Sequence, residues 1–122
     1  MTMTLDEHRA AFWQEVDKLL RTVDEIMQAI DDADPDTIDR LVYEGGKLGV
    51  SLHAHAKVIV SDRTTLLPTA KVITAVSSSL TSAREVFDLA LEYAKAIRQA
   101  DDHRVSIQAM EILLRGKPII EA

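Results

Sequence analysis

Apolar residues recur along the first quarter of the chain at the spacing of one helix face. From Phe12 to Ile30 the steps between them are four, three, four, three and four residues, which is the period of an amphipathic helix. A second apolar series, repeating every seven residues, widens this face beyond a two-stranded seam and favours a multi-helix bundle: Trp13, Leu20 and Met27. Thr4 and Glu7 have the spacing of a capping box. The pattern predicts a helix over residues 5–31.

A second helix is predicted to begin at Pro35, because Asp34 is a good N-cap and proline suits the first helical position. The short connection before it indicates antiparallel neighbours. The apolar face comprises Ile38, Leu41, Gly45, Leu48, Leu52, Ala56 and Ile59. Gly45, Gly46 and Gly49 weaken this helix, since each interior glycine costs about 1 kcal/mol relative to alanine. They indicate a kink or a close approach of another backbone, and close packing is favoured because Gly45 and Gly49 lie on the apolar side.

A third amphipathic pattern follows a polar loop over residues 61–67. It begins near Pro68 and continues in an unbroken apolar phase to Ile97, which predicts one long helix over residues 68–99. The serines and threonines of residues 77–82 are poor helix formers. Ser82 and Glu85 also have the spacing of a capping box, so a new helix starting there is the alternative.

A short helix is predicted over residues 102–115, with Asp101 and Asp102 as N-cap candidates and Gly116 and Pro118 as stop signals. It is apolar on two sides, and three longer helices lack the surface to cover both. The second side therefore indicates contact with another subunit. The residues predicted to form an oligomer or partner interface are Val105, Ile107, Met110, Ile112, Leu114, Ile119 and Ile120.

The predicted fold is all-α: one domain over residues 1–122, an antiparallel helical bundle of three long helices plus a short C-terminal helix, and oligomeric. The composition, 47% hydrophobic, 28% charged and 4% aromatic, is that of a globular chain and favours helices over a β-sandwich. The absence of cysteine excludes disulfides, thiolate metal sites and thiol catalysis. The sequence shows neither a targeting segment nor a membrane-length apolar run, so we expect a soluble cytoplasmic protein.

Catalytic or metal chemistry is not expected. His53 and His55 are two apart and therefore point about 200° from each other on a helix, which is a poor ligand pair. Ser77 to Ser79 lack a nucleophile turn and a histidine nearby in sequence. Gly45-Gly46-Lys47 lacks the spacing of a phosphate loop. The expectation is a non-enzyme without cofactor or metal.

The charge distribution gives only weak support for nucleic-acid binding. The net charge is −6, and residues 1–32 hold eight acids against three bases, whereas residues 61–100 hold four acids and five bases. The candidate nucleic-acid contacts come from this second region, although a solvated helix face explains them as well: Arg63, Lys71, Arg84, Lys95 and Arg98.

One resemblance concerns the C-terminal part of the chain. The stretches Leu91-Glu92-Tyr93-Ala94-Lys95 and residues 100–114, with Asp101-Asp102-His103-Arg104 at their centre, resemble the C-terminal half of some phage terminase small subunits. In that family a long helix, an acidic-His-Arg turn and a short helix form an oligomerising hairpin. The resemblance implies a ring-forming, non-catalytic adaptor in the host cytoplasm that recognises viral DNA and hands it to a large ATPase and nuclease subunit. This sequence departs from the pattern in having an acidic first helix and no N-terminal DNA-binding helix-turn-helix.

A small helical chaperone or regulator is the alternative. Such a protein resembles in outline the flagellar export chaperones, in which amphipathic helices hold a partner helix in a groove. The two-sided last helix and Ile119-Ile120 then bind a client in place of a sister subunit.

Overall fold

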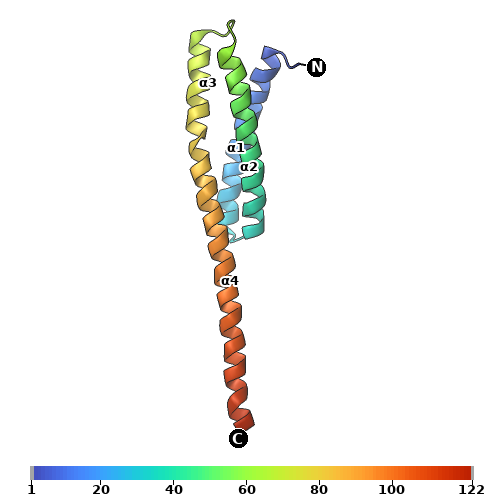
Figure 1. Ribbon diagram of the computed structural model, residues 1–122, viewed down its shortest axis with the longest axis vertical. Helices are drawn as coiled ribbons and strands as arrows, with labels where there is room; N and C mark the ends of the chain where they lie inside the picture. Colours follow the sequence, from blue (N-terminus) through green and yellow to red (C-terminus); the bar gives the residue numbers. More distant parts are fainter. Residues whose placement is uncertain (1, 122) are drawn as a thin grey trace.

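The chain is all-helical in the computed structural model, which describes residues 2–121 and, within them, the side chains of residues 2–104 and 106–112. Four helices follow one another in this part of the chain: α1 (Leu5–Asp31), α2 (Pro35–Ser61), α3 (Leu67–Leu80) and α4 (Ser82–Glu121). The chain reverses direction after α1 and again after α2. α4 then continues the course of α3 and runs far beyond the other helices (Figure 1).

The first two helices have the bounds expected from the sequence. The Thr4 hydroxyl accepts a hydrogen bond from the Glu7 backbone N–H at 3.2 Å and so caps α1. Asp34 caps α2 in the same way through the Thr37 backbone N–H, also at 3.2 Å. Ala33, between the two helices, has φ of 52°, the left-handed conformation that closes this tight connection.

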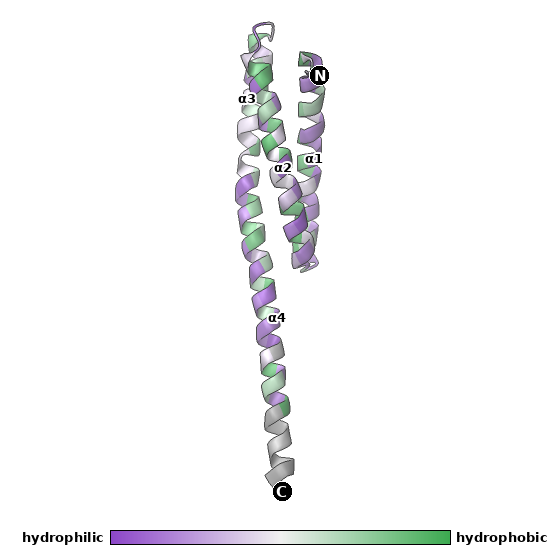
Figure 2. Cartoon of the chain, turned by 45° about the vertical axis from the view of Figure 1, so that its right-hand side comes forward, coloured by the Kyte–Doolittle hydropathy of each residue, from purple (hydrophilic) through white to green (hydrophobic). Residues whose placement is uncertain are grey.

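The core lies where α1, α2 and the α3–α4 arm meet. α2 is the central element, because it packs against α1, α3 and α4, whereas α1 and α3 do not contact each other. The core is built mainly from aliphatic side chains and two phenylalanines: Phe12, Val16, Leu19, Ile26, Ala29, Ile38, Leu41, Leu52, Ala56, Ile59, Ile73, Phe87, Ala90 and Ala94. Figure 2 shows hydrophobic and hydrophilic residues interspersed along each of these helices.

Close packing is confirmed at Gly45, where a side chain and not another backbone approaches, and is wrong at Gly49. A Cβ atom at this position would lie 2.5 Å from Cζ of Phe87 on α4, so only a glycine lets the ring approach α2 this closely. Gly46 and Gly49 have no atom within 4 Å of a built Cβ, so the same reason does not apply to them.

The single helix predicted over residues 68–99 is wrong, since α3 ends at Leu80 and α4 begins at Ser82. Hydroxyl side chains bond back to carbonyls one turn earlier, from Ser79 to Ala75 at 2.9 Å and from Thr81 to Ser77 at 3.3 Å. Such bonds compete with the helical ladder. The backbone tightens here, with the Thr81 N–H bonded to the Ser78 carbonyl at 3.1 Å.

The separate short helix predicted over residues 102–115 is also wrong, because α4 is continuous from Ser82 to Glu121. Asp101 does not cap a new helix and accepts a hydrogen bond from Arg104 Nη2 on the outside of α4, at 2.7 Å. Gln99 and Ala100 favour helix, so nothing interrupts the ladder between residues 97 and 104. Gly116 and Pro118 disfavour a helix interior without ending this one.

Candidate assembly surface

The face of α4 that packs on the bundle becomes polar where the bundle ends. Phe87, Ala90 and Ala94 are buried, and Ile97 packs partly buried against them. Continued in steps of four and three, the same face carries four exposed polar residues: Asp101, Arg104, Gln108 and Glu111. At 1.5 Å per residue, the projecting part, residues 99–121, is about 35 Å long. The sequence therefore encodes the point at which α4 leaves the bundle.

Exposed apolar side chains lie on two other sides of this projecting part. Ile107 and Met110, three residues apart on one side, are 56% and 61% exposed. Ile112 is 70% exposed and shares the opposite side with Ala109, since a step of five residues turns the helix by 140° from Ile107. Large apolar side chains exposed on two sides of one projecting helix make it a candidate contact surface.

The remaining predicted interface residues belong to the part of α4 whose side chains are not described. Val105, Leu114, Ile119 and Ile120 fall outside the described side chains, so the apolar surface is defined by Ile107, Met110 and Ile112.

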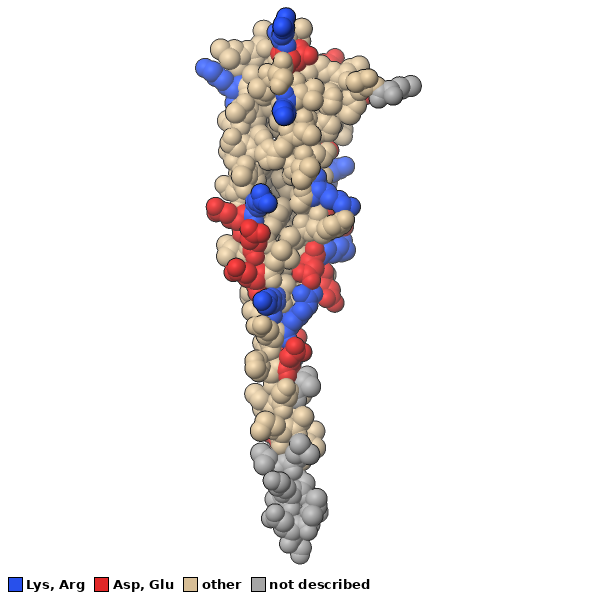
Figure 3. Space-filling view, in the orientation of Figure 1, with Lys and Arg blue, Asp and Glu red and all other residues tan. Residues whose placement is uncertain are grey.

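The candidate nucleic-acid contacts do not form one basic patch. Arg63 lies in the loop between α2 and α3, and Lys71 lies on α3. Arg84, Lys95 and Arg98 share one side of α4, being eleven and three residues apart. In the face that Figure 3 presents, basic and acidic side chains alternate along the middle of the molecule.

Arg98 is bound within the chain. Its Nη2 donates to Asp36 Oδ1 at 2.8 Å and to Asp39 Oδ2 at 2.6 Å. These hydrogen bonds and the charge of the two carboxylates raise the pKa of Arg98 above its ordinary value. The side chain therefore ties α4 to the first turns of α2, where it is least available to a phosphate.

The two neighbouring histidines of α2 face different helices, as their spacing predicted. His53 Nδ1 lies 2.6 Å from the hydroxyl of the buried Ser77 on α3. Sequence reasoning missed this pair, because the two residues are adjacent only through the fold. Ser77 lies inside a helix, whose backbone N–H groups are engaged and cannot form an oxyanion hole. The contact satisfies a buried hydroxyl and does not assemble a nucleophilic site.

His55, on the other side of α2, belongs to a polar chain between α1 and α2. Its Nδ1 lies 2.8 Å from Nδ1 of His8, and its Nε2 lies 3.6 Å from Oε1 of Glu15. The same Glu15 oxygen accepts a hydrogen bond from Ser51 at 2.6 Å. The signal in the sequence is the pairing of Ser51 and His55, four apart on one side of α2, with His8 and Glu15, seven apart on α1.

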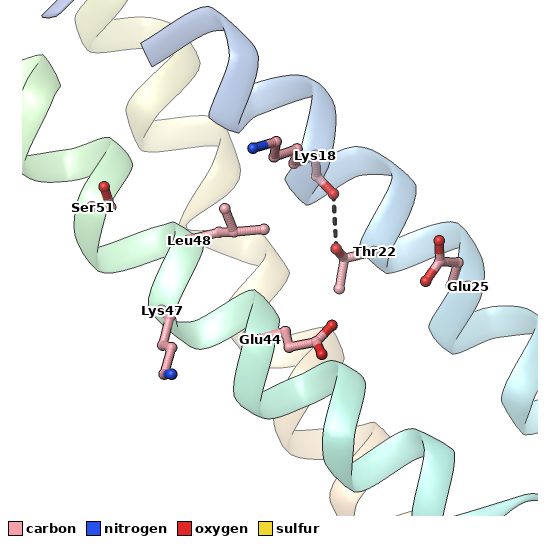
Figure 4. Close-up of a pocket in the computed structure, with 7 residues that line it drawn as sticks. All are labelled: Lys18, Thr22, Glu25, Glu44, Lys47, Leu48 and Ser51. Carbon is pink, nitrogen blue, oxygen red and sulfur yellow. Dashed lines mark hydrogen bonds between the residues drawn. The ribbon is translucent and has the colours of Figure 1, made fainter. Parts of the chain in front are cut away.

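The acidic and histidine side chains of the described residues do not gather into a metal site. Residues 2–112 contain no group of three or more His, Asp or Glu placed to hold a metal ion. A depression of about 510 Å³ between α1 and α2 is lined by Lys18, Thr22, Glu25, Glu44, Lys47, Leu48 and Ser51. In it the Thr22 hydroxyl donates to the Lys18 carbonyl at 2.8 Å, and the Glu44 side chain extends from α2 toward α1 (Figure 4).

A second depression, of about 370 Å³, lies where Gly46 and Gly49 leave space beside α4. Leu80, Phe87 and Arg84 line its other wall. Among the described helices, none has the length and apolar character needed to cross a membrane.

Comparison of the chain with protein-family models, with curated proteins and with solved structures finds no match.

Proposed function

We propose that the protein is a non-enzymatic helical adaptor that self-associates through the projecting part of α4. The observation that carries this proposal is the exposure of Ile107, Met110 and Ile112 on a helix segment that has left its own bundle. The folded unit is an antiparallel bundle, and the projecting segment is its docking arm.

Several copies fit the arm better than two. A dimer formed through Ile107 and Met110 leaves Ile112 on the opposite side in water. A head-to-tail arrangement uses both sides, since each arm then lies between two others, and such contacts close into rings when the rotation allows. The polar residues between the two sides, Arg104 and Gln108 among them, remain solvated at the rim of each contact.

Light scattering on the purified protein tests the proposal. The expected mass is three or more times the 13.5 kDa of one chain. Ile107→Asp and Met110→Asp each place a charge in the contact and are expected to reduce the mass to that of one chain with little change in helix content by circular dichroism. Gln14→Asp, at an exposed position of α1 away from the projecting part, introduces the same charge as a control and retains the oligomer.

A wild-type mass of one chain overturns the proposal, as does an unchanged mass in both the Ile107 and the Met110 variant. A monomer that binds an apolar helical peptide beside Gly46 and Gly49 would support the helix-binding chaperone in its place.

DNA packaging, as in a terminase small subunit, is the specific form of adaptor that we propose for this assembly. Its support is the resemblance of residues 91–95 and 100–114, together with Arg84 and Lys95 on one side of α4, which a ring repeats around its axis. The turn that forms the hairpin in the resemblance is replaced here by continuous helix. We expect the oligomer to be retained on duplex DNA and this retention to weaken steeply as the salt concentration rises. We expect Lys95→Gln to weaken the retention further. Equal retention of wild type and variant at all salt concentrations contradicts direct binding through this side.

A further inference from the structure

The contact between His8 and His55 joins the start of α1 to the second half of α2 through two ring nitrogens of the same kind. The Nδ1 atoms lie 2.8 Å apart, a hydrogen-bond distance, and the ring centroids lie 5.0 Å apart. A hydrogen bond between two imidazole nitrogens requires one of them to donate and the other to accept. At least one of the two rings must therefore be neutral.

The surrounding groups define how many protons this contact accepts. With its carboxylate held by the Ser51 hydroxyl, Glu15 favours a proton on His55 Nε2. His55 then either accepts at Nδ1 from His8 as a neutral ring, or donates at Nδ1 to a neutral His8 as a cation. Both states keep the contact. A second proton makes both Nδ1 atoms donors, and two cations then face each other without an acceptor between them.

The charged side chains found beside this cluster come from α1 and from the end of α2. Glu15 is 17% exposed at its side chain and is the nearest carboxylate to His55. Arg9, next to His8, is a cation that lies 3.8 Å from Asp6 and acts on Asp62 at the end of α2. One carboxylate balances one charged imidazole, and Arg9 adds to the repulsion when both rings are charged.

The first turns of α1 contain no fully buried residue, although Arg9 and Ala11 are partly buried. Asp6, Glu7 and Ala10 are exposed, and Leu5 packs only partly buried against the core. The first fully buried residue of α1 is Phe12. A segment with so few buried contacts opens locally at a lower free energy than the whole fold.

We propose that the His8–His55 contact is a pH-sensitive clasp, which holds residues 5–11 of α1 against α2 and opens when both imidazole rings carry a proton. The opened segment binds two protons where the closed contact accepts one. By linkage, closure is favoured at higher pH and is lost as the pH falls far enough to place a proton on both rings. The proposal is independent of self-association through α4.

Trp13 provides the readout, because it is the only tryptophan and its ring lies 5.1 Å from that of Phe12, one turn beyond His8. On titration of the full chain from pH 8 to pH 5, we expect a reversible change in Trp13 emission. The far-UV circular dichroism signal should fall by no more than about the two turns of residues 5–11, at 3.6 residues per turn.

His8→Asn tests the clasp directly, since an amide group offers donor and acceptor near the position of Nδ1 but takes up no proton. We expect this variant, and His55→Asn as a second one, to lack the transition. His103→Asn, on the exposed projecting part of α4, is the matched control and keeps it. The clasp is overturned by an equal transition in His8→Asn, by a wild-type chain with no transition although NMR shows both rings protonated, or by loss of most helix signal in the same step.

Discussion

Gly45 on α2 and the ring of Phe87 on α4 pack so closely that residue 45 has no room for a side chain. A Cβ atom there would lie 2.5 Å from the Phe87 ring. The ring is itself buried and cannot swing into water. This pair fixes how closely the α3–α4 arm approaches α2, and thus the direction in which α4 leaves the bundle.

Gly45→Ala is accordingly expected to destabilise the fold although alanine favours helix. The propensity gain is about 1 kcal/mol, and forcing a methyl group into a packed core costs about 1–3 kcal/mol, so a net loss of up to about 2 kcal/mol is expected. Gly46→Ala is the matched control, since its Cβ meets open space, and it should gain up to about 1 kcal/mol. Urea unfolding of both variants measures the difference. A stabilised Gly45→Ala would show that the ring yields at little cost.

Ala33→Gly is expected to stabilise the protein. Ala33 is exposed and has φ of 52°, a conformation that costs an L-residue about 1–2 kcal/mol, and glycine adopts it at a smaller cost in unfolded-state entropy. The expected net gain is up to about 1 kcal/mol, read as a higher midpoint in urea. A destabilised variant would contradict the left-handed assignment of this residue.

Asp34→Ala should lower stability at neutral pH, and the difference should vanish in acid. Hydrogen bonds from the Thr37 hydroxyl and backbone N–H hold the pKa of Asp34 below its ordinary value. A carboxylate whose pKa is lowered by folding stabilises the folded state at pH values above its unfolded pKa, near 3.9. This stabilisation is lost as the pH falls toward the folded pKa. Thermal unfolding of wild type and variant at pH 7 and near pH 3 measures this. Asp24→Ala, at an exposed position in the interior of α1 that caps no helix, is the control.

Ser51→Ala is expected to destabilise more than Ser77→Ala. Removing the Ser51 hydroxyl takes from Glu15, a carboxylate at 17% exposure, its 2.6 Å donor and leaves it only His55 Nε2 at 3.6 Å. The loss of a hydrogen bond to a shielded charged group costs about 1–3 kcal/mol. Removing the Ser77 hydroxyl frees His53, which is exposed and finds water, so we expect a loss below about 1 kcal/mol. Denaturant midpoints of the two variants compare them, and equal losses would contradict the role assigned to Glu15.

A chain ending at Ala100 is expected to remain folded and to be monomeric. The buried core ends at Ala94, with Ile97 packed partly against it, so residues 101–122 contribute nothing to the described core. Circular dichroism and light scattering on the shortened chain check both parts. Persistence of an oligomer would place the contact on the bundle, where Trp13, Leu20 and Met27 are also exposed.

The sequence predicted the first residue of α1 and of α2 correctly. Thr4 and Asp34 cap these helices through hydrogen bonds to residues only three positions further along the chain. The sequence also predicted that the end of the chain carries apolar residues its own bundle does not cover, although it placed Ile107 and Met110 on a separate short helix. That error arose because Asp101 and Asp102 have the form of an N-cap, and a cap residue inside a favourable helical stretch does not interrupt the ladder.

The order of apolar and polar residues by itself determined the helical class, the first two helices and the exposure of Ile107, Met110 and Ile112, since each depends on spacing along one helix. Only the tertiary structure decided which residues meet across helices: Gly45 with Phe87, Ser77 with His53, and His8 with His55. These contacts join residues 24 to 47 positions apart, and helix periodicity gives the side on which a residue lies but not the partner that the packing of α2 brings to it.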